Sequence, residues 1–142
     1  PYMTKAATFP ESTITATPIS YMGREIQIPG NRESVQWTNT IYNDEGMQIR
    51  NNIESWMEQL NSHKSNIRAA AMTQIQSYTG TLKVRQFAKD GASSTKSYEF
   101  IDAWPSAVGD ITVDWETNEI QTYAVTWEYS YWKSAQSNVG FV

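Results

Sequence analysis

The sequence predicts an α+β fold that is mainly antiparallel β-structure, with about seven strands and one clear α-helix. Several segments alternate between apolar and polar residues and are separated by turn signals, as half-buried strands are. Only one segment repeats its apolar residues clearly with the period of a helix. The aromatic content is 13%, with six tryptophans, which is typical of β-rich proteins with large contact surfaces.

The length and composition narrow the class of protein. The 142 residues fit one domain, 1–142, that can bury its own core. There is no cysteine and a single histidine, His63, which excludes thiolate chemistry and leaves few ligands for zinc. The net charge of −4 argues against a dedicated nucleic-acid binder. No apolar run approaches the roughly 20 residues of a membrane span, and no signal peptide opens the chain. Because there is no initiator methionine, we expect a trimmed or processed N-terminus.

The N-terminal third predicts an arm followed by two strands. Residues 1–18 are rich in Thr, Ser and Pro and have no clean period, which indicates an extended arm or long loop. From Ile19 the sequence ISYMGREIQI alternates, and PGN at 29–31 predicts a turn before a second strand, SVQWTNTIY. The first strand would place Met22, Arg24, Ile26 and Ile28 on one side and Tyr21, Glu25 and Gln27 on the other. The second would place Val35, Trp37 and Ile41 on an apolar face and Ser34, Gln36, Thr38 and Thr40 on a polar, uncharged face.

Residues 43–61 predict the helix. The apolar residues of this segment fall on one stripe, formed by Ile49, Ile53, Trp56, Met57 and Leu60. Asn43 is expected to be the N-cap, with Asp44 and Glu45 at the positive end of the helix dipole. The stripe indicates a helix that packs on a sheet.

The C-terminal half predicts two hairpins. TLKVRQFA and KSYEFIDAW flank a turn that contains Asp90-Gly91, and Trp104-Pro105 is expected to end the second of these strands. ITVDW and IQTYAVTWEYSYW flank ETNE and predict the last pair. The final strand would have an aromatic side, formed by Tyr123, Val125, Trp127, Tyr129 and Tyr131, and a side of small residues, formed by Ile120, Thr122, Ala124, Thr126 and Ser130. The segment from Lys64 to Tyr78 is compatible with a short helix or a loop.

No catalytic constellation emerges from the sequence. Phosphate-binding glycine loops are absent, and a nucleophilic triad would depend on His63 alone. Two carboxylates of the set Asp110, Asp114, Glu116 and Glu119 could in principle form a glycosidase pair, but they are better explained as the edge of a hairpin turn. Their spacing does not match a calcium-binding EF-hand loop. We therefore expect no enzyme, no cofactor and no metal.

Three segments carry a resemblance to a known family. They are VQWTNTIYNDEGMQIRNNIESW, LKVRQFAKDG and AWPSAVGDITVDWETNEIQTYAVTWEYSYW, with the W-P, V-G, D-W and N-E-I-Q-T elements at the family's spacing. The chain resembles the tail-tube proteins of contractile-tailed, myovirus-type bacteriophages over most of residues 3–132. The segment 63–79 departs from the family pattern, and a strand that usually precedes the arm is expected to be missing.

The resemblance implies a fold of two packed antiparallel sheets, of the tail-tube barrel or sandwich type, with one flanking helix. It implies hexameric rings, joined edge to edge by their inner sheets and stacked into a hollow tube inside a contractile sheath. The protein would be made in the cytoplasm of the host bacterium and reside in the virion. Expected partners are further copies, the tail sheath protein, and the baseplate and tail-terminator proteins. The tape measure protein and genomic DNA would occupy the bore without sequence-specific binding.

Candidate residues follow for three surfaces. A bore that passes DNA must not hold phosphates, so neutral or acidic side chains are expected on it, with Glu25, Gln27, Gln36, Thr38 and Thr40 as candidates. The arm would contact the next ring through residues such as Phe9, Pro10, Glu11, Ile14 and Pro18. The polar side of the helix would face the sheath through Arg50, Glu54 and Glu58.

A second interpretation remains open at this point. A β-sandwich that binds carbohydrate or another ligand would use exposed aromatic rings as platforms, with Trp115 and Trp132 as candidates. A tube protein of a related contractile injection or secretion system is a third possibility. Hollow filaments of purified protein would favour a tube, whereas a stable monomer with sugar affinity would favour the binding module.

Overall fold

The computed structural model describes residues 3–91, 93–116 and 118–136 and is mainly β-structure, as predicted. The elements, in chain order, are β1 (Thr4–Ala7), β2 (Thr13–Tyr21), β3 (Arg24–Glu33), β4 (Trp37–Tyr42), α1 (Gln48–Leu60), a 3₁₀ turn (Ala70–Met72), α2 (Ile75–Tyr78), β5 (Gly80–Phe87), β6 (Ser94–Val108), β7 (Thr122–Glu128) and β8 (Tyr131–Gln136). All strand pairs are antiparallel.

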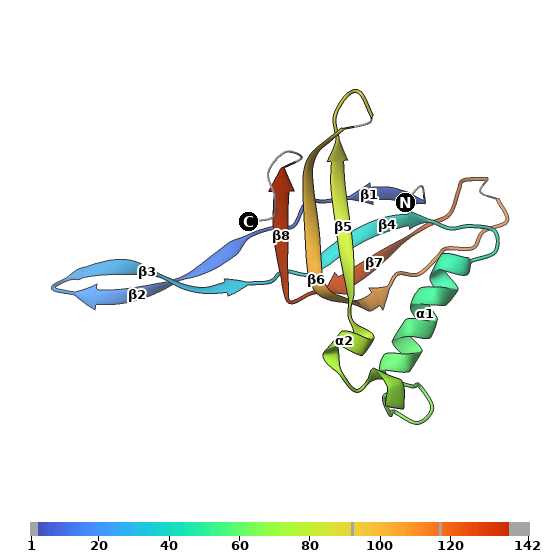
Figure 1. The fold of residues 1–142 in the computed structure, drawn as a ribbon, viewed down its shortest axis with the longest axis horizontal. Coiled ribbons are helices and arrows are strands. Elements are labelled where there is room, and N and C mark those ends of the chain that lie inside the picture. Colours follow the sequence, from blue (N-terminus) through green and yellow to red (C-terminus); the bar gives the residue numbers. More distant parts are fainter. Residues whose placement is uncertain (1–2, 92, 117, 137–142) are drawn as a thin grey trace.

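One strongly bent sheet forms the body of the molecule (Figure 1). Its strand order is β1-β4-β7-β6-β5, and β8 also pairs with β6. The long strand β6 belongs to both halves, since Lys96–Ile101 pairs with β8 whereas Trp104–Val108 pairs with β7. Between these stretches Asp102 has a φ of 55°, a left-handed conformation that turns the strand. The two halves of the sheet therefore pack face to face, as the family resemblance implies.

The core fills the space between the two halves. Phe100 of β6 is fully buried, and its ring lies 4.9 Å from those of both Trp37 and Tyr129. Helix α1 closes one end through Ile53, which is buried, and Trp56, whose ring lies 5.9 Å from that of Trp127. Four residues of the predicted apolar helix stripe are in or against this core, namely Ile49, Ile53, Trp56 and Met57.

The N-terminal region differs from the prediction in where its hairpin turns. Met22 and Gly23, with φ values of 47° and 80°, connect β2 to β3, as a two-residue turn with left-handed backbone requires. The predicted turn at 29–31 lies inside β3, where Pro29 is tolerated because a two-stranded ribbon has open edges. The arm is extended, but it is not a loop throughout, because β1 and more than half of β2 lie within it.

The helix is shorter at its N-terminus than predicted, and Asn43 is not its cap. Met47 occupies the N-cap position in a left-handed conformation without a side-chain cap. The carboxylate of Asp44 instead accepts the backbone N–H of Gln48 at 3.2 Å, which satisfies one of the free donors of the first turn. Asn43 hydrogen-bonds with Gln121, the residue before β7, and so holds the start of the helix segment beside that strand.

Three predictions in the C-terminal half are wrong. Trp104-Pro105 does not end β6, because a bulge and an open outer edge accommodate the proline. The segment ITVDW is a loop, since no strand of the described chain pairs with it. Tyr131 does not continue the aromatic core side, because the chain bends at Ser130 and leaves Tyr131 exposed. The core positions Tyr123, Val125, Trp127 and Tyr129 are confirmed.

Two buried tyrosines make the stability of the fold sensitive to alkaline pH. Burial raises the pKa of Tyr123 and Tyr129 above the ordinary value of 10.0, and the neighbouring carboxylates of Asp44 and Glu128 add to the rise. The unfolded chain therefore loses these protons at lower pH than the folded chain. The free energy of unfolding should fall as the pH rises from the unfolded pKa through the folded pKa.

We expect Tyr123→Phe to move the midpoint of alkaline unfolding to higher pH. The Tyr123 hydroxyl has no hydrogen-bond partner among the described residues, so its removal should change the free energy of unfolding at pH 7 by about 1 kcal/mol or less. Circular dichroism between about pH 9 and 12 measures the shift. Tyr21→Phe, at an exposed tyrosine, is the matched control. Equal midpoints for the two variants would contradict this explanation.

Candidate assembly surfaces

The β2–β3 hairpin extends from the body as a free two-stranded ribbon (Figure 1). Almost every one of its residues is exposed. The register pairs Thr17 with Ile28, Ile19 with Ile26 and Tyr21 with Arg24, so these six residues form one face, called here the apolar hairpin face. Tyr21 therefore lies on the same face as Ile26. The prediction that it shares a face with Glu25 is wrong. An isolated hairpin is marginally stable in water, which makes this uncovered face a candidate binding surface.

The opposite face of the hairpin is polar and includes two of the predicted bore residues. Glu25 pairs with Ser20, and Gln27 pairs with Pro18. The carboxylate side chain of Glu25 and the amide side chain of Gln27 are both exposed. The hairpin is thus amphipathic, and the exposed side chains of Ile19, Ile26 and Ile28 are on its apolar face.

The other three predicted bore residues lie together on the outer face of β4 and of the residue that precedes it, Gln36. Gln36, Thr38 and Thr40 alternate with the buried Trp37 and Ile41. The Thr38 hydroxyl lies 3.4 Å from that of Thr126 on β7, and the Gln36 amide donates to the Glu128 carboxylate. This outer face of β4 and β7 is polar, and none of its β4 residues carries a charge.

Two strand edges of the β1-β4-β7-β6 half-sheet have no partner in the described chain. One is the outer edge of β1, and the other is the second edge of β6 along Trp104–Val108, where β5 no longer pairs. The open edge of β6 faces a cleft of about 1000 Å³ beneath α1, lined by side chains that include Met57, Trp104 and Val108. Open edges are places where a strand of another chain can add.

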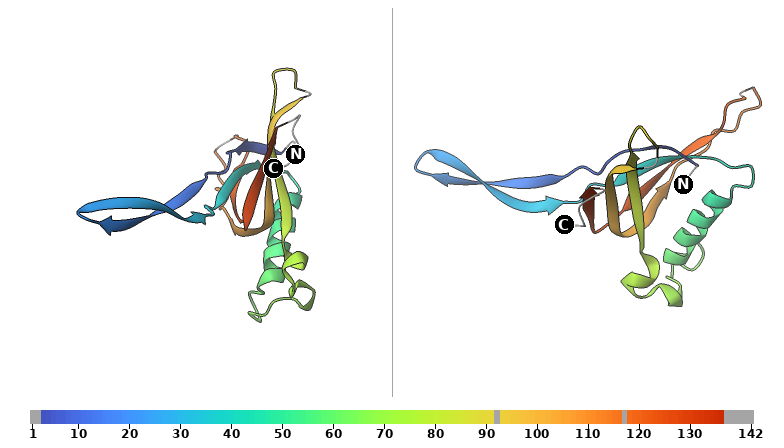
Figure 2. Two further views of the ribbon diagram at one scale, coloured as in Figure 1. Left: turned by 60° about the vertical axis from the view of Figure 1, so that its left-hand side comes forward. Right: turned by 45° about the horizontal axis from the view of Figure 1, so that its top comes forward.

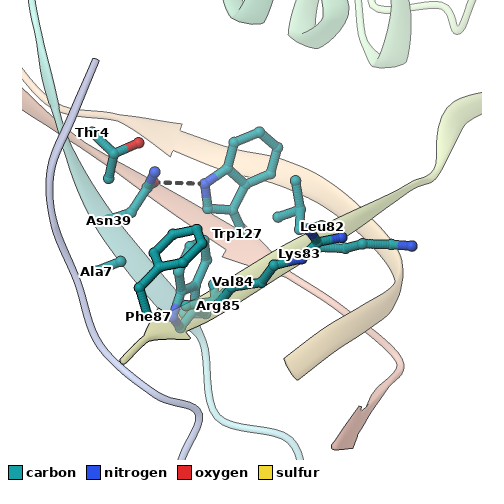
Figure 3. A pocket seen from close by; sticks show the side chains of 10 residues that line it. Thr4, Ala7, Asn39, Leu82, Lys83, Val84, Arg85, Phe87 and Trp127 are labelled. Atoms are coloured by element: carbon teal, nitrogen blue, oxygen red, sulfur yellow. Dashed lines mark hydrogen bonds between the residues drawn. The ribbon is translucent and has the colours of Figure 1, made fainter. Parts of the chain in front are cut away.

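A second cavity opens between β1 and β5, at the mouth of the bent sheet (Figure 3). It measures about 690 Å³ and is lined mostly by apolar side chains, among them Trp37, Leu82 and Trp127. The indole N–H of Trp127 donates to Asn39 Oδ1 at 2.9 Å, and Lys83 pairs with Glu99 at 2.9 Å. No acid, base and nucleophile converge here, so the cavity suits apolar contact and not catalysis.

The predicted outward residues of α1 differ in their surroundings. Arg50 donates to Glu54 at 2.7 Å and to the Gly109 carbonyl at 2.9 Å, and its guanidinium lies over the Tyr123 ring. It therefore joins the helix to the end of β6. Glu58 accepts the His63 N–H at 3.2 Å and remains half exposed, as does Glu54.

The five arm candidates are also divided between two environments. The Phe9 ring lies 4.9 Å from Tyr98, so it packs partly on its own subunit, beside Pro10. Glu11 precedes β2, while Ile14 and Pro18 lie within it and are exposed. The two aromatic rings proposed as ligand platforms differ as well. Trp115 is fully exposed, but Trp132 packs edge-on against Tyr98 at 5.3 Å.

Neither a metal-binding cluster nor a membrane-spanning helix is found in the described part of the chain. No three acidic or histidine side chains are grouped there as metal ligands. None of its helices has the length and apolar character needed to cross a membrane. What the molecule offers instead is open edges and uncovered apolar surface.

A family model described as phage tail tube protein matches residues 1–135. The chain belongs to the phage tail tube family. Tail tube protein gp19 of Enterobacteria phage T4 and its counterpart in phage T6 are each 32% identical over 133 residues, covering 93% of this chain and 80% of each relative. The sheath–tube complex of the extracellular contractile injection system PVC contains a chain with the same fold. It has a TM-score of 0.70 and 12% identity, with 94% of this chain and 80% of that chain covered.

The protein is thus a structural subunit of a phage tail tube and a component of the virion tail. The carbohydrate-binding alternative is not favoured. The apolar hairpin face of the tail tube subunit was not predicted from the sequence, whereas Trp115 is exposed, as expected. The Met22-Gly23 pair between two alternating segments was the available signal for the hairpin.

Proposed function

We propose that this tail tube subunit assembles into closed hexameric rings that stack into a hollow conduit for DNA. The observation that supports this most strongly is the combination of two open edges on one half-sheet with an uncovered apolar hairpin. A monomer leaves both exposed, whereas copies arranged head to tail cover both.

Within a ring, the outer edge of β1 would add to the open edge of β6 in the neighbouring copy. The four strands β1, β4, β7 and β6 would then continue from copy to copy as one barrel. The cleft between α1 and Trp104–Val108 provides space for the incoming strand. Rotation about a common axis closes such a heterologous contact into a ring.

The outer face of β4 and β7 would line the bore. Gln36, Thr38 and Thr40 offer no cation to DNA phosphates, so transit is not slowed by phosphate binding. Glu25 and Gln27 of the polar hairpin face likewise offer no cation. By contrast, exposed Lys83 and Arg85 are on β5, in the other half of the sheet, which this arrangement turns away from the DNA.

The hairpin and the arm would make the contact between rings. Ile14 and Pro18 are part of the hairpin, and Phe9, Pro10 and Glu11 form the link between its base and β1. The outward side of α1, through Glu54 and Glu58 with Arg50 as their anchor, would face the sheath. Baseplate and terminator proteins at the tube ends, and the tape measure protein within the bore, complete the proposed set of partners.

Light scattering and microscopy of the purified protein test this proposal. Light scattering should increase steeply above a threshold concentration, and negative-stain images should show hollow filaments of constant diameter. Rings without filaments would support the lateral contact alone. A compact monomer at all concentrations, also when sheath and baseplate proteins are supplied, would contradict the proposal.

A further inference from the structure

The loop of residues 110–121, between β6 and β7, exposes three large apolar side chains. Val113 is 80% exposed, Trp115 is fully exposed and Ile120 is 72% exposed. Its described residues, 110–116 and 118–121, belong to no strand, and the Asp114 carboxylate accepts the backbone N–H of Glu116 at 3.1 Å next to the tryptophan. Large aromatic side chains are seldom left wholly in water, and apolar groups gathered in this way mark interaction surfaces.

This loop and the β2–β3 hairpin lie at opposite ends of the molecule. They are separated along its longest axis in Figure 1 and again in the right-hand view of Figure 2. The apolar hairpin face is uncovered at its end, with Ile19 47%, Ile26 51% and Ile28 42% exposed. A single copy cannot bring the two surfaces together.

We propose that the loop residues Val113, Trp115 and Ile120 of one copy dock on the apolar hairpin face of a copy in the adjacent ring. This inference rests on the proposed stacking of rings and names the two surfaces that meet in it. Head-to-tail stacking pairs different surfaces from opposite ends of the subunit, which is how these two are placed. Each would bury apolar area that has no cover within its own chain.

Charge favours the same pairing. Asp114 and Glu116 flank Trp115 in the sequence, and Arg24 is the charged residue of the apolar hairpin face. Arg24 forms no salt bridge within the described part of the chain. An acidic rim around the tryptophan and a cation beside its docking surface are complementary, and such complementarity sets the register of an interface.

Site-directed crosslinking tests the contact, because the chain has no cysteine of its own. The test variant combines Val113→Cys with Thr17→Cys, which lies on the apolar hairpin face. The control combines Val113→Cys with Ser20→Cys, an equally small residue on the opposite face of the same strand. Both keep Trp115. After assembly, oxidation or a short bis-maleimide should join the test variant into a ladder of multimers and leave the control mainly monomeric.

A truncation gives an independent readout. Trp115→Ala should fold normally, because the side chain has no cover in the subunit, but should raise the threshold concentration for filaments about 30-fold. That factor is typical of a lost central aromatic contact. Glu119→Ala in the same loop is the control, with a change of threefold or less expected. If wild-type protein forms no filaments, the stacking proposal itself fails. If wild-type filaments form, equal thresholds for Trp115→Ala and wild type, or stronger crosslinking through Ser20→Cys, would overturn the docking contact alone.

Discussion

Double replacement of Ile19 and Ile26 by serine is expected to give a folded subunit that does not grow into tubes. The two residues are a cross-strand pair at the centre of the apolar hairpin face, and about half of each side chain is exposed. If that surface is buried between rings, the change reduces the free energy of association by about 3 kcal/mol per copy. Association is then roughly 100-fold weaker. The melting temperature should remain nearly unchanged, because the hairpin is outside the core built around Phe100.

The matched control for this hairpin variant is on the other face of the same ribbon. Ser20 and Glu25 are also a cross-strand pair, and their replacement by alanine should leave the tube length and threshold concentration close to wild type. Sedimentation and negative-stain microscopy measure both variants. Full-length tubes from the Ile19→Ser/Ile26→Ser protein would show that the hairpin does not hold the rings together.

Replacement of Thr38 and Thr126 by lysine should convert the tube into a DNA-binding filament. The two hydroxyls lie 3.4 Å apart on the face proposed to line the bore. The resulting ring of cations would hold phosphates, and the affinity for DNA should fall steeply with salt, by about 10³-fold or more between 50 and 200 mM. Filter binding to assembled tubes measures the affinity, and phage carrying the variant should deliver DNA poorly.

The control for the lysine variant adds one lysine per copy outside the proposed bore, where the test variant adds two within it. Asn52→Lys is at an exposed position of α1, so its tubes should bind DNA only weakly. Tubes of the Thr38→Lys/Thr126→Lys variant that bind DNA no better than Asn52→Lys tubes would place Thr38 away from the conduit. Assembly itself is expected to proceed in both cases, because none of the three positions is part of the core.

The parts of the fold that could be predicted from sequence are those with a repeated pattern. The helix stripe from Ile49 to Met57 and the aromatic side of β7 were recognisable because burial on one face imposes a period on the residues. The start of α1 was misplaced because Asn43 and Asp44 both suit a helix N-terminus. Only the structure shows that the Asp44 side chain accepts a hydrogen bond from the backbone N–H of Gln48, four residues later, in the first turn.

The errors arose where tertiary context overrides a local signal. Pro29 and Pro105 read as strand ends, yet both lie in strands with an open edge, where a missing N–H is harmless. ITVDW alternates like a strand but has no partner in the described chain. The three candidate surfaces were only partly predictable, because the register that puts Tyr21 beside the isoleucines depends on a turn at Met22-Gly23.

The most direct test of the assembly is a cryo-electron microscopy reconstruction of the filaments formed by purified wild-type protein. We expect β1 of each copy to lie beside Trp104–Val108 of its neighbour, with Gln36, Thr38 and Thr40 on the inner wall. A reconstruction in which these two edges face solvent, or in which the outer face of β4 lies on the outside of the tube, would contradict this arrangement.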